Sequence, residues 1–399
     1  MRAGIIPMDV TIQEIYTQLV EQLHPSSETA SLDAQVLLAH CLEKPRSWIL
    51  AHPEARLTET QYENICQAVD RLIRSEPLPY VIGHWEFYGL DFQLTPDVLV
   101  PRPETEILVE RAINWLQSHP HKRKAVDVGT GSGCIGISIT KHVPDLHLVL
   151  TDISSQALEA AQVNAAKHGV LTRLEFKKAN LIDGVTGPFD LMCANLPYIP
   201  TNILNTLPVV SKEPRTALDG GLSGTELIGR LLQQGKGQLV SGGSLLLEIE
   251  SSQGTEVETL ARSCYPLSKV DILKDLSGQD RCLVIERPNL LVHICPRAEW
   301  LQAQQIGIYR DASLEQARFI HCSQPEQVLE VANHFYVSVP ELVSLWLDPE
   351  KLTSEICWKN VEGTLFPHIY GLINLDAVIS ASDMLPDHDG IFRNLRLPG

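Results

Sequence analysis

The sequence has no apolar run of the length needed to cross a bilayer, and its first ten residues lack both a basic stretch and a long apolar region. We therefore expect neither a membrane span nor a secretion signal. Two methionines, Met1 and Met8, are candidate translation starts, and the sequence does not decide between them.

Cysteine pairs are also missing. The nine cysteines are scattered singly between Cys41 and Cys357, with no Cys-x-x-Cys pair. An odd, unpatterned set in a long chain predicts reduced thiols and a cytoplasmic protein. The same pattern disfavours a zinc site, so no metal is expected.

Positive charge is scarce. The chain has 32 Lys and Arg against 49 Asp and Glu, a formal net charge of −17, and residues 289–399 alone have 7 against 14. Binding to a phosphate backbone depends on Lys and Arg that release counterions. The composition therefore disfavours nucleic acid as a substrate or a direct partner.

The 399 residues, 44% of them apolar, are enough for two or three domains. In residues 11–76 the apolar positions recur at helical spacing, with one helix start at Thr58, and Pro77 and Pro79 are expected to end this region. This pattern predicts a small helical N-terminal domain over residues 1–78. An accessory bundle and a dedicated docking domain explain it equally well.

Residues 79–288 have a different pattern, because short apolar strands alternate with helices from Lys124 onward. This alternation predicts an α/β fold with a doubly wound, mostly parallel sheet that closes with an antiparallel strand. Right-handed crossovers bring the carboxyl ends of the strands, and any ligand, to one edge. The expected strands are 125–128, 146–150, 189–194, 245–249, 270–273 and 282–285, and the expected helices are 134–142 and 154–168.

The strongest local signal is the segment Asp-Val-Gly-Thr-Gly-Ser-Gly at 127–133, between a strand and a helix. Glycines there let the backbone turn sharply and approach a ligand at a helix N-terminus. The spacing Gly131-x-Gly133-x-x-Gly136 also satisfies the dinucleotide fingerprint. Asp127 argues against a dinucleotide, because a carboxylate would repel a pyrophosphate but suits the ammonium or sulfonium of S-adenosylmethionine. Asp152 suits ribose hydroxyls in either case.

The segment Asn195-Leu196-Pro197-Tyr198 follows a predicted strand, so it should lie at the same edge as the glycine loop. A planar amide or aromatic amine is a poor nucleophile because its lone pair is delocalised. The Asn195 side-chain oxygen and the backbone carbonyl of Leu196 can accept both N–H groups and direct the lone pair toward a methyl group. Pro197 keeps Leu196 extended, and Tyr198 can stack on the planar group.

Four further motifs accompany these two loops. They are Gly-His-Trp-Glu-Phe-Tyr-Gly at 83–89, Val-Pro-Arg-Pro-Glu-Thr-Glu at 100–106, Glu-Pro-x-x-Ala-Leu at 213–218 and Ser-Gly-Gly-Ser-Leu-Leu-Leu-Glu at 241–248. With them, residues 10–287 resemble the release factor glutamine methyltransferases, the PrmC/HemK family. The fold implied by the resemblance is a Rossmann-like class I methyltransferase, preceded by a helical domain that binds release factors.

The resemblance implies S-adenosylmethionine as the cofactor. It also implies N5-methylation of the glutamine in the Gly-Gly-Gln motif of class 1 peptide chain release factors. Asn195 and Tyr198 would then be catalytic, within a glutamine site made of Asn195, Leu196, Pro197 and Tyr198. The implied cofactor site contains Gly129, Thr130, Gly131, Ser132 and Gly133 at the methionine part, Asp152 at the ribose, Asn180 and Leu181 near the adenine, and Asn195.

Two positions depart from the family pattern. The usual Asn-Pro-Pro-Tyr is Asn-Leu-Pro-Tyr here, which should be tolerated because Leu196 is needed only for its carbonyl. An acid is common at the adenine position, where this chain has Asn180. An amide can still bond the adenine amino group, so the departure concerns cofactor affinity.

Residues 289–399 lie outside that family and have a mixed pattern that predicts a small α+β domain. Their Phe-Ile-His-Cys-Ser at 319–323 and Phe-Pro-His-Ile-Tyr-Gly at 366–371 resemble an uncharacterised small bacterial domain family. A nucleophile or metal site built from His293, His321, His334, His368 and Cys322 is one interpretation. We favour the other, in which these side chains belong to an ordinary core.

Two rival functions stay open. The Asn-x-Pro-Tyr geometry also suits an exocyclic amine, so an adenine-N6 methyltransferase acting on nucleic acid is one alternative, which the acidic composition disfavours. The other is a ligand-binding or regulatory protein that acts through residues 289–399.

Overall fold

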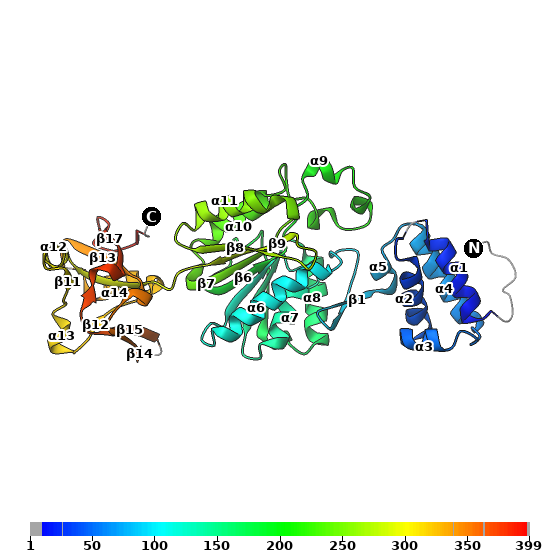
Figure 1. Ribbon diagram of the computed structural model, residues 1–399, viewed down its shortest axis with the longest axis horizontal. Helices are drawn as coiled ribbons and strands as arrows, with labels where there is room; N and C mark the ends of the chain where they lie inside the picture. Colours follow the sequence, from blue (N-terminus) through cyan, green and yellow to red (C-terminus); the bar gives the residue numbers. More distant parts are fainter. Residues whose placement is uncertain (1–9, 26, 338, 362–363, 397–399) are drawn as a thin grey trace.

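The computed structural model describes residues 10–25, 27–337, 339–361 and 364–396, so Met1 and Met8 lie outside the described residues. Along its longest axis the chain forms a helical part, a central α/β part and a smaller β-rich part (Figure 1). None of the helices in the described ranges is both long and apolar enough to span a membrane.

The helical part contains α1 (Ile12–Leu23), α2 (Ala30–Leu42), α3 (Arg46–Ala51), α4 (Glu59–Ile73) and α5 (Leu78–Ile82). Capping boxes at Thr11 and Thr58 start α1 and α4, since each hydroxyl accepts a backbone N–H that the helix leaves unpaired. The apolar stripes of these helices pack on one another in a single core. Contrary to the expectation, Pro77 and Pro79 do not end the helical packing: Pro77 is the N-cap of α5 and Pro79 stands in its first turn, where a missing N–H breaks no helix bond.

A hairpin links this part to the central one. Its strands are β1 (His84–Phe87) and β2 (Leu90–Gln93), joined by Tyr88 and Gly89, both at positive φ. The buried Asn164 amide accepts from the Gln93 N–H at 2.7 Å and donates to the Gln93 carbonyl at 3.0 Å. The hairpin is thus fastened to the helix that contains Asn164.

The central sheet has seven strands in the order β5-β4-β3-β6-β7-β9-β8. Neighbours from β5 to β7 are parallel, and β9 is antiparallel to both β7 and β8. This arrangement confirms the predicted fold class. The strands are β3 (Lys124–Val128), β4 (His147–Asp152), β5 (Leu174–Lys178), β6 (Phe189–Ala194), β7 (Leu239–Glu248), β8 (Lys269–Lys274) and β9 (Asp280–Glu286).

Helices cover both faces of this sheet (Figure 1). On one face α6 (Glu106–Ser118), α7 (Cys134–His142) and α8 (Ser155–Lys167) pack with strand residues such as Ala125. On the other, α10 (Glu226–Gly235) and α11 (Gly254–Cys264) pack with Val126 and Val128. The short helix α9 (Thr201–Leu204) lies in the loop after β6.

The C-terminal part has two three-stranded sheets, β10-β13-β17 and β12-β15-β14, with two small apolar cores. It is α+β, as predicted. Its elements are β10 (Leu291–Pro296), α12 (Arg297–Ile306), β11 (Ile308–Tyr309), α13 (Ser313–Gln316), β12 (Ile320–His321), α14 (Val328–Phe335), β13 (Leu342–Leu347), β14 (Glu355–Val361), β15 (Thr364–Tyr370), β16 (Ile373–Asn374) and β17 (Val378–Met384).

Three of the four histidines lie close together, because the rings of His321 and His368 have centroids 5.4 Å apart and His293 is next to His321. His293 is buried and bonds the His321 carbonyl at 2.7 Å and the Tyr309 hydroxyl at 2.9 Å. His368 stacks on Phe319, while His334 is exposed. In the described ranges, no three His, Cys, Asp or Glu side chains are grouped as a metal site would require.

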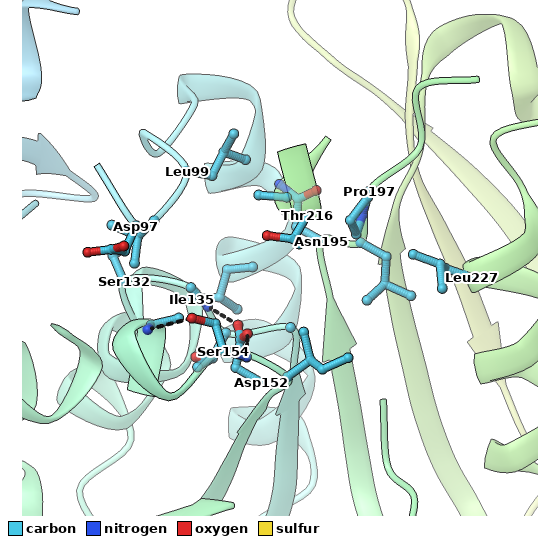
Figure 2. A pocket seen from close by; sticks show the side chains of 18 of the residues that line it. Asp97, Leu99, Ser132, Ile135, Asp152, Ser154, Asn195, Pro197, Thr216 and Leu227 are labelled. Carbon is cyan, nitrogen blue, oxygen red and sulfur yellow. Dashed lines mark hydrogen bonds between the residues drawn. The ribbon is translucent and has the colours of Figure 1, made fainter. Parts of the chain in front are cut away.

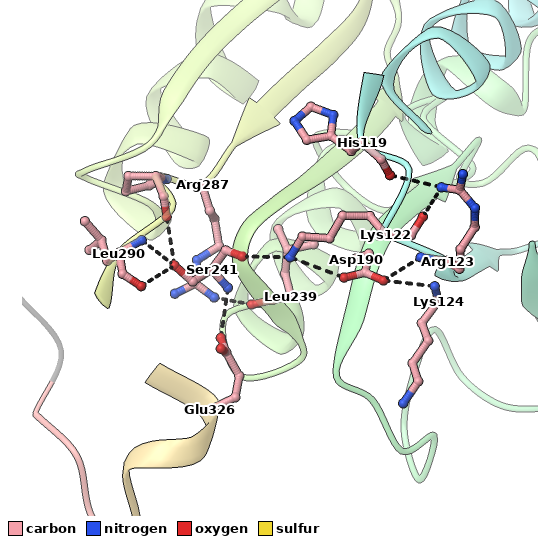
Figure 3. A network of polar contacts seen from close by, with 11 residues as sticks. His119, Lys122, Arg123, Lys124, Asp190, Leu239, Ser241, Arg287, Leu290 and Glu326 are labelled. Atoms are coloured by element: carbon pink, nitrogen blue, oxygen red, sulfur yellow. Dashed lines mark hydrogen bonds and ion pairs between the residues drawn. The ribbon is translucent and has the colours of Figure 1, made fainter. Parts of the chain in front are cut away.

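A polar junction joins the C-terminal part to the start of β7 (Figure 3). The Ser241 backbone N–H donates to Glu326 Oε1 at 2.8 Å, and the Ser241 hydroxyl accepts from the Leu290 N–H at 2.7 Å. The Arg287 guanidinium donates to the Leu239 carbonyl, and burial lowers the pKa of this Arg while Glu326 opposes that effect. The junction lies at the amino edge of the sheet.

Candidate active site

A cavity of about 440 Å³ opens at the carboxyl edge of the central sheet. Its walls come from the loops after four neighbouring strands: Gly129 and Gly131 after β3, Asp152 at the end of β4, Asn180 after β5 and Asn195 after β6. Figure 2 shows Asp152 and Ser154 on one side of it and Asn195 and Pro197 on the other. The glycine loop and the Asn195 segment therefore share one edge, as predicted.

The glycine loop depends on three left-handed residues, since Gly129, Gly131 and Gly133 have φ of 72°, 55° and 82°. The N–H groups of Gly129 and Thr130 both donate to the Thr151 carbonyl at 2.9 Å. A Cβ on Gly131 would meet no atom within 4 Å, so the backbone of this glycine is open to the cavity it lines.

Asp127 does not face the cavity. Its side chain is fully buried, and its Oδ2 accepts from the Thr130 hydroxyl at 2.6 Å and from the Gly136 N–H at 3.0 Å. Burial raises the pKa of Asp127 to about 6. Asp127 therefore does not make the expected contact with a cofactor cation. Its role is structural, because it fastens the glycine loop to the first turn of α7.

Asp152 lines the cavity at the end of β4. Its Oδ2 accepts from the Gly131 N–H at 3.0 Å, and its Oδ1 accepts from the Ser154 N–H at 2.9 Å. Burial raises the pKa of this carboxyl. Each carboxylate oxygen has a second lone pair, so Asp152 can still accept from ligand hydroxyls.

Asn180 and Leu181 line the cavity beyond β5. Leu181 is 8% exposed and has φ of 59°, a left-handed conformation that is rare for a branched apolar residue. Residues in such conformations cluster at functional sites. Together with Ala179 and Leu227, Leu181 gives this end of the cavity an apolar wall.

Asn195, Leu196 and Pro197 line the opposite wall. Asn195 Nδ2 donates to the Thr105 hydroxyl at 3.2 Å, and Leu196 is 3% exposed. Two predicted site residues are not among those that line the cavity, Gly133 and Tyr198. The Tyr198 hydroxyl donates to Glu248 Oε1 at 3.4 Å, and burial together with Glu248 raises the pKa of this tyrosine.

Sequence reasoning did not name several residues of this site. Pro101, Arg102 and Thr105 line the cavity, and Arg102 forms an ion pair with the buried Glu213. The Val100 N–H also donates to Glu213 Oε2 at 3.3 Å. Two of the family motifs, at 100–106 and 213–218, are thus one structural unit. In the sequence, the only sign of this contact is that both segments match motifs of the same family.

Comparison with known families agrees with this geometry. The methyltransferase small domain family matches residues 104–207, which include the glycine loop and Asn195. The fold, the cavity and this match define the chain as an S-adenosylmethionine-dependent methyltransferase. The PrmC N-terminal domain family matches residues 14–83.

The chain is 38% identical over 281 residues to the release factor glutamine methyltransferase of Moorella thermoacetica, covering 70% of this chain and 99% of that protein. It is 34% identical over 284 residues to the enzyme of the same name from Coxiella burnetii, covering 70% and 99%. The chain belongs to the release factor glutamine methyltransferase family. The predicted family, enzyme class and cofactor are confirmed.

Residues 294–381 match a separate family, described as a protein of unknown function, DUF952. A crystal structure of a protein from Caulobacter crescentus is 31% identical to this chain, covers 26% of this chain and 93% of its own, and has a TM-score of 0.25.

Proposed function

We propose that this protein transfers a methyl group from S-adenosylmethionine to the side-chain nitrogen (N5) of the glutamine in the Gly-Gly-Gln motif of class 1 release factors. The observation that carries the proposal is the position of Asn195, whose amide lines the cavity beside the glycine loop. The two N–H groups of a substrate amide need hydrogen-bond acceptors, and the Asn195 side-chain oxygen can be one of them. The enzyme would act in the cytoplasm, without nucleic acid or membrane as a partner.

The cavity fits the cofactor. Its volume of about 440 Å³ is within the usual range for small-molecule sites. Gly129, Thr130, Gly131 and Ser132 would hold the methionine part through the open backbone at Gly131, and Gly133, which does not line the cavity, would shape the turn behind them. Asp152 would accept from the ribose hydroxyls. Asn180 and Leu181 would contact the adenine, at the apolar wall, and Asn195 would border the cofactor from the other side.

S-adenosylmethionine supplies an electrophilic methyl group on its sulfonium. The protein's part is to hold the glutamine amide in line with that group. Asn195 Oδ1 and the Leu196 carbonyl would each accept one N–H of the amide, which turns the nitrogen lone pair toward the methyl group. The surplus proton leaves to water after transfer.

Pro197 would keep the Leu196 carbonyl in position, and Tyr198 would complete the glutamine site with its ring. The hydroxyl of Tyr198 is bonded to Glu248, and its carbonyl accepts from Gln253 Nε2 at 2.9 Å. Both ends of this residue are therefore held, which keeps the ring in one orientation. Asn195 and Tyr198 are the proposed catalytic residues.

We further propose that residues 1–78 dock the release factor, residues 79–288 catalyse the transfer and residues 289–399 form an accessory domain. Support comes from the family matches at 14–83, 104–207 and 294–381. The helical part and the C-terminal part lie at opposite ends of the chain's long axis (Figure 1).

The test is mass spectrometry of a class 1 release factor after incubation with the protein and S-adenosylmethionine. We expect a gain of one methyl group on the Gly-Gly-Gln peptide, and none on a factor whose glutamine is replaced by glutamate. An unmodified peptide with a competent factor would contradict the proposal. Methylation of an adenine-containing oligonucleotide in place of the peptide would favour the rival enzyme.

A further inference from the structure

Two buried polar side chains, Thr105 and Glu248, lie next to Asn195, and the mechanism above gives neither of them a part in orienting the Asn195 amide. Thr105 ends the short 3-10 helix Pro103–Thr105, and Glu248 is the last residue of β7. Each is 2% exposed. A carboxylate this deeply buried needs compensating partners, so its contacts are informative.

Hydrogen bonds link Asn195 to Thr105 and Thr105 to Glu248, and the donor and acceptor of each bond are fixed. Asn195 Nδ2 lies 3.2 Å from the Thr105 hydroxyl oxygen, and that oxygen lies 2.5 Å from Glu248 Oε2. A carboxylate only accepts, and a hydroxyl has one proton. Thr105 therefore gives its proton to Glu248 and can only accept from Asn195.

This direction decides which way the Asn195 amide faces. Its NH₂ group must point to Thr105, since its oxygen there would oppose a hydroxyl lone pair. Oδ1 is left as the free acceptor of this side chain. Glu248 also holds the other end of the segment, because its Oε1 accepts from the Tyr198 hydroxyl at 3.4 Å.

We propose that Thr105 and Glu248 are positioning residues that fix the Asn195 amide with Oδ1 turned toward the substrate. The inference rests on the proposed function and deepens it. It also gives a common purpose to two of the family motifs, since Thr105 belongs to the segment 100–106 and Glu248 to the segment 241–248.

The charge state of Glu248 should then control the orientation. Burial raises the pKa of Glu248 to about 7, while Thr105 and the Arg281 charge oppose that rise and Glu104 adds to it. The ionisable groups that face it are Tyr198, Arg281, Glu104, Cys134 and Cys282. When Glu248 is protonated it can donate to Thr105. The hydroxyl proton is then free to turn to Asn195 and favour the reversed amide.

The experiment compares wild type with Glu248→Gln, Thr105→Val and Thr105→Ser in the full chain. Glu248→Gln keeps the shape but adds a donor, Thr105→Val removes the hydroxyl, and Thr105→Ser retains it. Glu286→Gln is the matched control, because Glu286 is also a strand-end carboxylate, on β9, but pairs with Arg111 away from the cavity. For each variant we would measure kcat, KM for the release factor, calorimetric affinity for S-adenosylmethionine and the pH dependence of kcat.

We expect kcat to fall about 10- to 100-fold in Glu248→Gln and Thr105→Val, the usual cost of losing a group that orients a functional ligand. Thr105→Ser and Glu286→Gln should stay within about twofold of wild type, and cofactor affinity should be retained in all four. Wild-type kcat should decline as the pH falls through about 7, because burial raises the pKa of Glu248 to about that value. That decline should be absent from Glu248→Gln.

A Glu248→Gln variant with wild-type kcat and the same acid decline overturns the inference, even though wild type methylates the factor. So does a loss confined to cofactor affinity or folding, because that result assigns Thr105 and Glu248 a structural role only. A wild type that does not methylate the factor contradicts the proposed function itself, and the positioning role with it.

Discussion

Gly129 lies directly against Leu196: a Cβ added to Gly129 would stand 3.1 Å from Leu196 Cδ2 and 3.8 Å from the Asn195 carbonyl oxygen. The loop proposed to hold the methyl donor is therefore in contact with the segment proposed to hold the acceptor. Gly129 also has φ of 72°. A side chain here would be strained and would press on the acceptor segment at once.

We predict that Gly129→Ala lowers affinity for S-adenosylmethionine about tenfold or more, with a larger loss in methylation rate because Leu196 is displaced. Gly169→Ala is the matched control. Gly169 has a similar φ of 70°, but its Cβ would meet nothing within 4 Å. Both variants should lose about 1 kcal/mol of stability from the left-handed backbone, and Gly129→Ala more than that because its Cβ presses on Leu196. Calorimetric binding separates them, and equal affinities in the two variants would contradict the prediction.

Asn195 offers a second test, because its amide is the proposed acceptor. Asn195→Ala should reduce kcat by about 10²–10³-fold, the usual effect of removing one preorganised hydrogen-bonding group. Its affinity for S-adenosylmethionine should change little, since the glycine loop and Asp152 remain. Single-turnover kinetics combined with cofactor titration distinguish these effects. A variant that keeps its rate would remove Asn195 from the mechanism.

Much of this architecture follows from local sequence. Strands β3 and β6 are buried apolar runs, and each leads directly into one of the two loops. The position of both loops at the carboxyl edge of the sheet could therefore be predicted from the sequence. Strand β5 was missed because its sequence, Leu-Glu-Phe-Lys-Lys, suits the exposed edge of the sheet and has no continuous apolar run. All nine cysteines are free thiols in the structure.

The directions of side chains and their contacts with residues far away in the sequence were harder to predict. In β3, Asp127 points to the same face as Ala125, because alternate residues share a face, and that face is covered by α7. The loop sequence alone therefore suggested the wrong partner for this carboxylate. The contact between Thr105 and Glu248 joins residues 143 positions apart, and no local pattern encodes such a pairing.

The buried Asp127 predicts a pH-dependent stability. Burial raises the pKa of Asp127 from 3.8 to about 6, so the folded chain retains a proton between these values that the unfolded chain releases. The raised pKa of Asp127 stabilises the folded state by up to about 3 kcal/mol. This stabilisation is complete below about pH 4 and is lost as the pH rises through about 6. The measurement is denaturant unfolding of wild type and Asp127→Asn at several pH values. Between about pH 4 and pH 6 the free energy of unfolding should fall more steeply in wild type than in Asp127→Asn. Parallel curves for the two proteins would contradict it.

The contact between Ser241 and Glu326 allows a test of whether the C-terminal part affects catalysis. Ser241 and Glu248 lie on the same strand, β7, but Ser241 is near its amino end, and the proposed catalytic contacts are at its carboxyl end. Glu326→Gln weakens the bond to the Ser241 N–H because a neutral amide oxygen is a poorer acceptor than a carboxylate. We expect faster hydrogen exchange of the Ser241 amide, with kcat and cofactor affinity within about twofold of wild type, as for a site separated from the reacting groups. A large change in kcat with intact cofactor binding would instead show that the C-terminal part communicates with the cavity along β7.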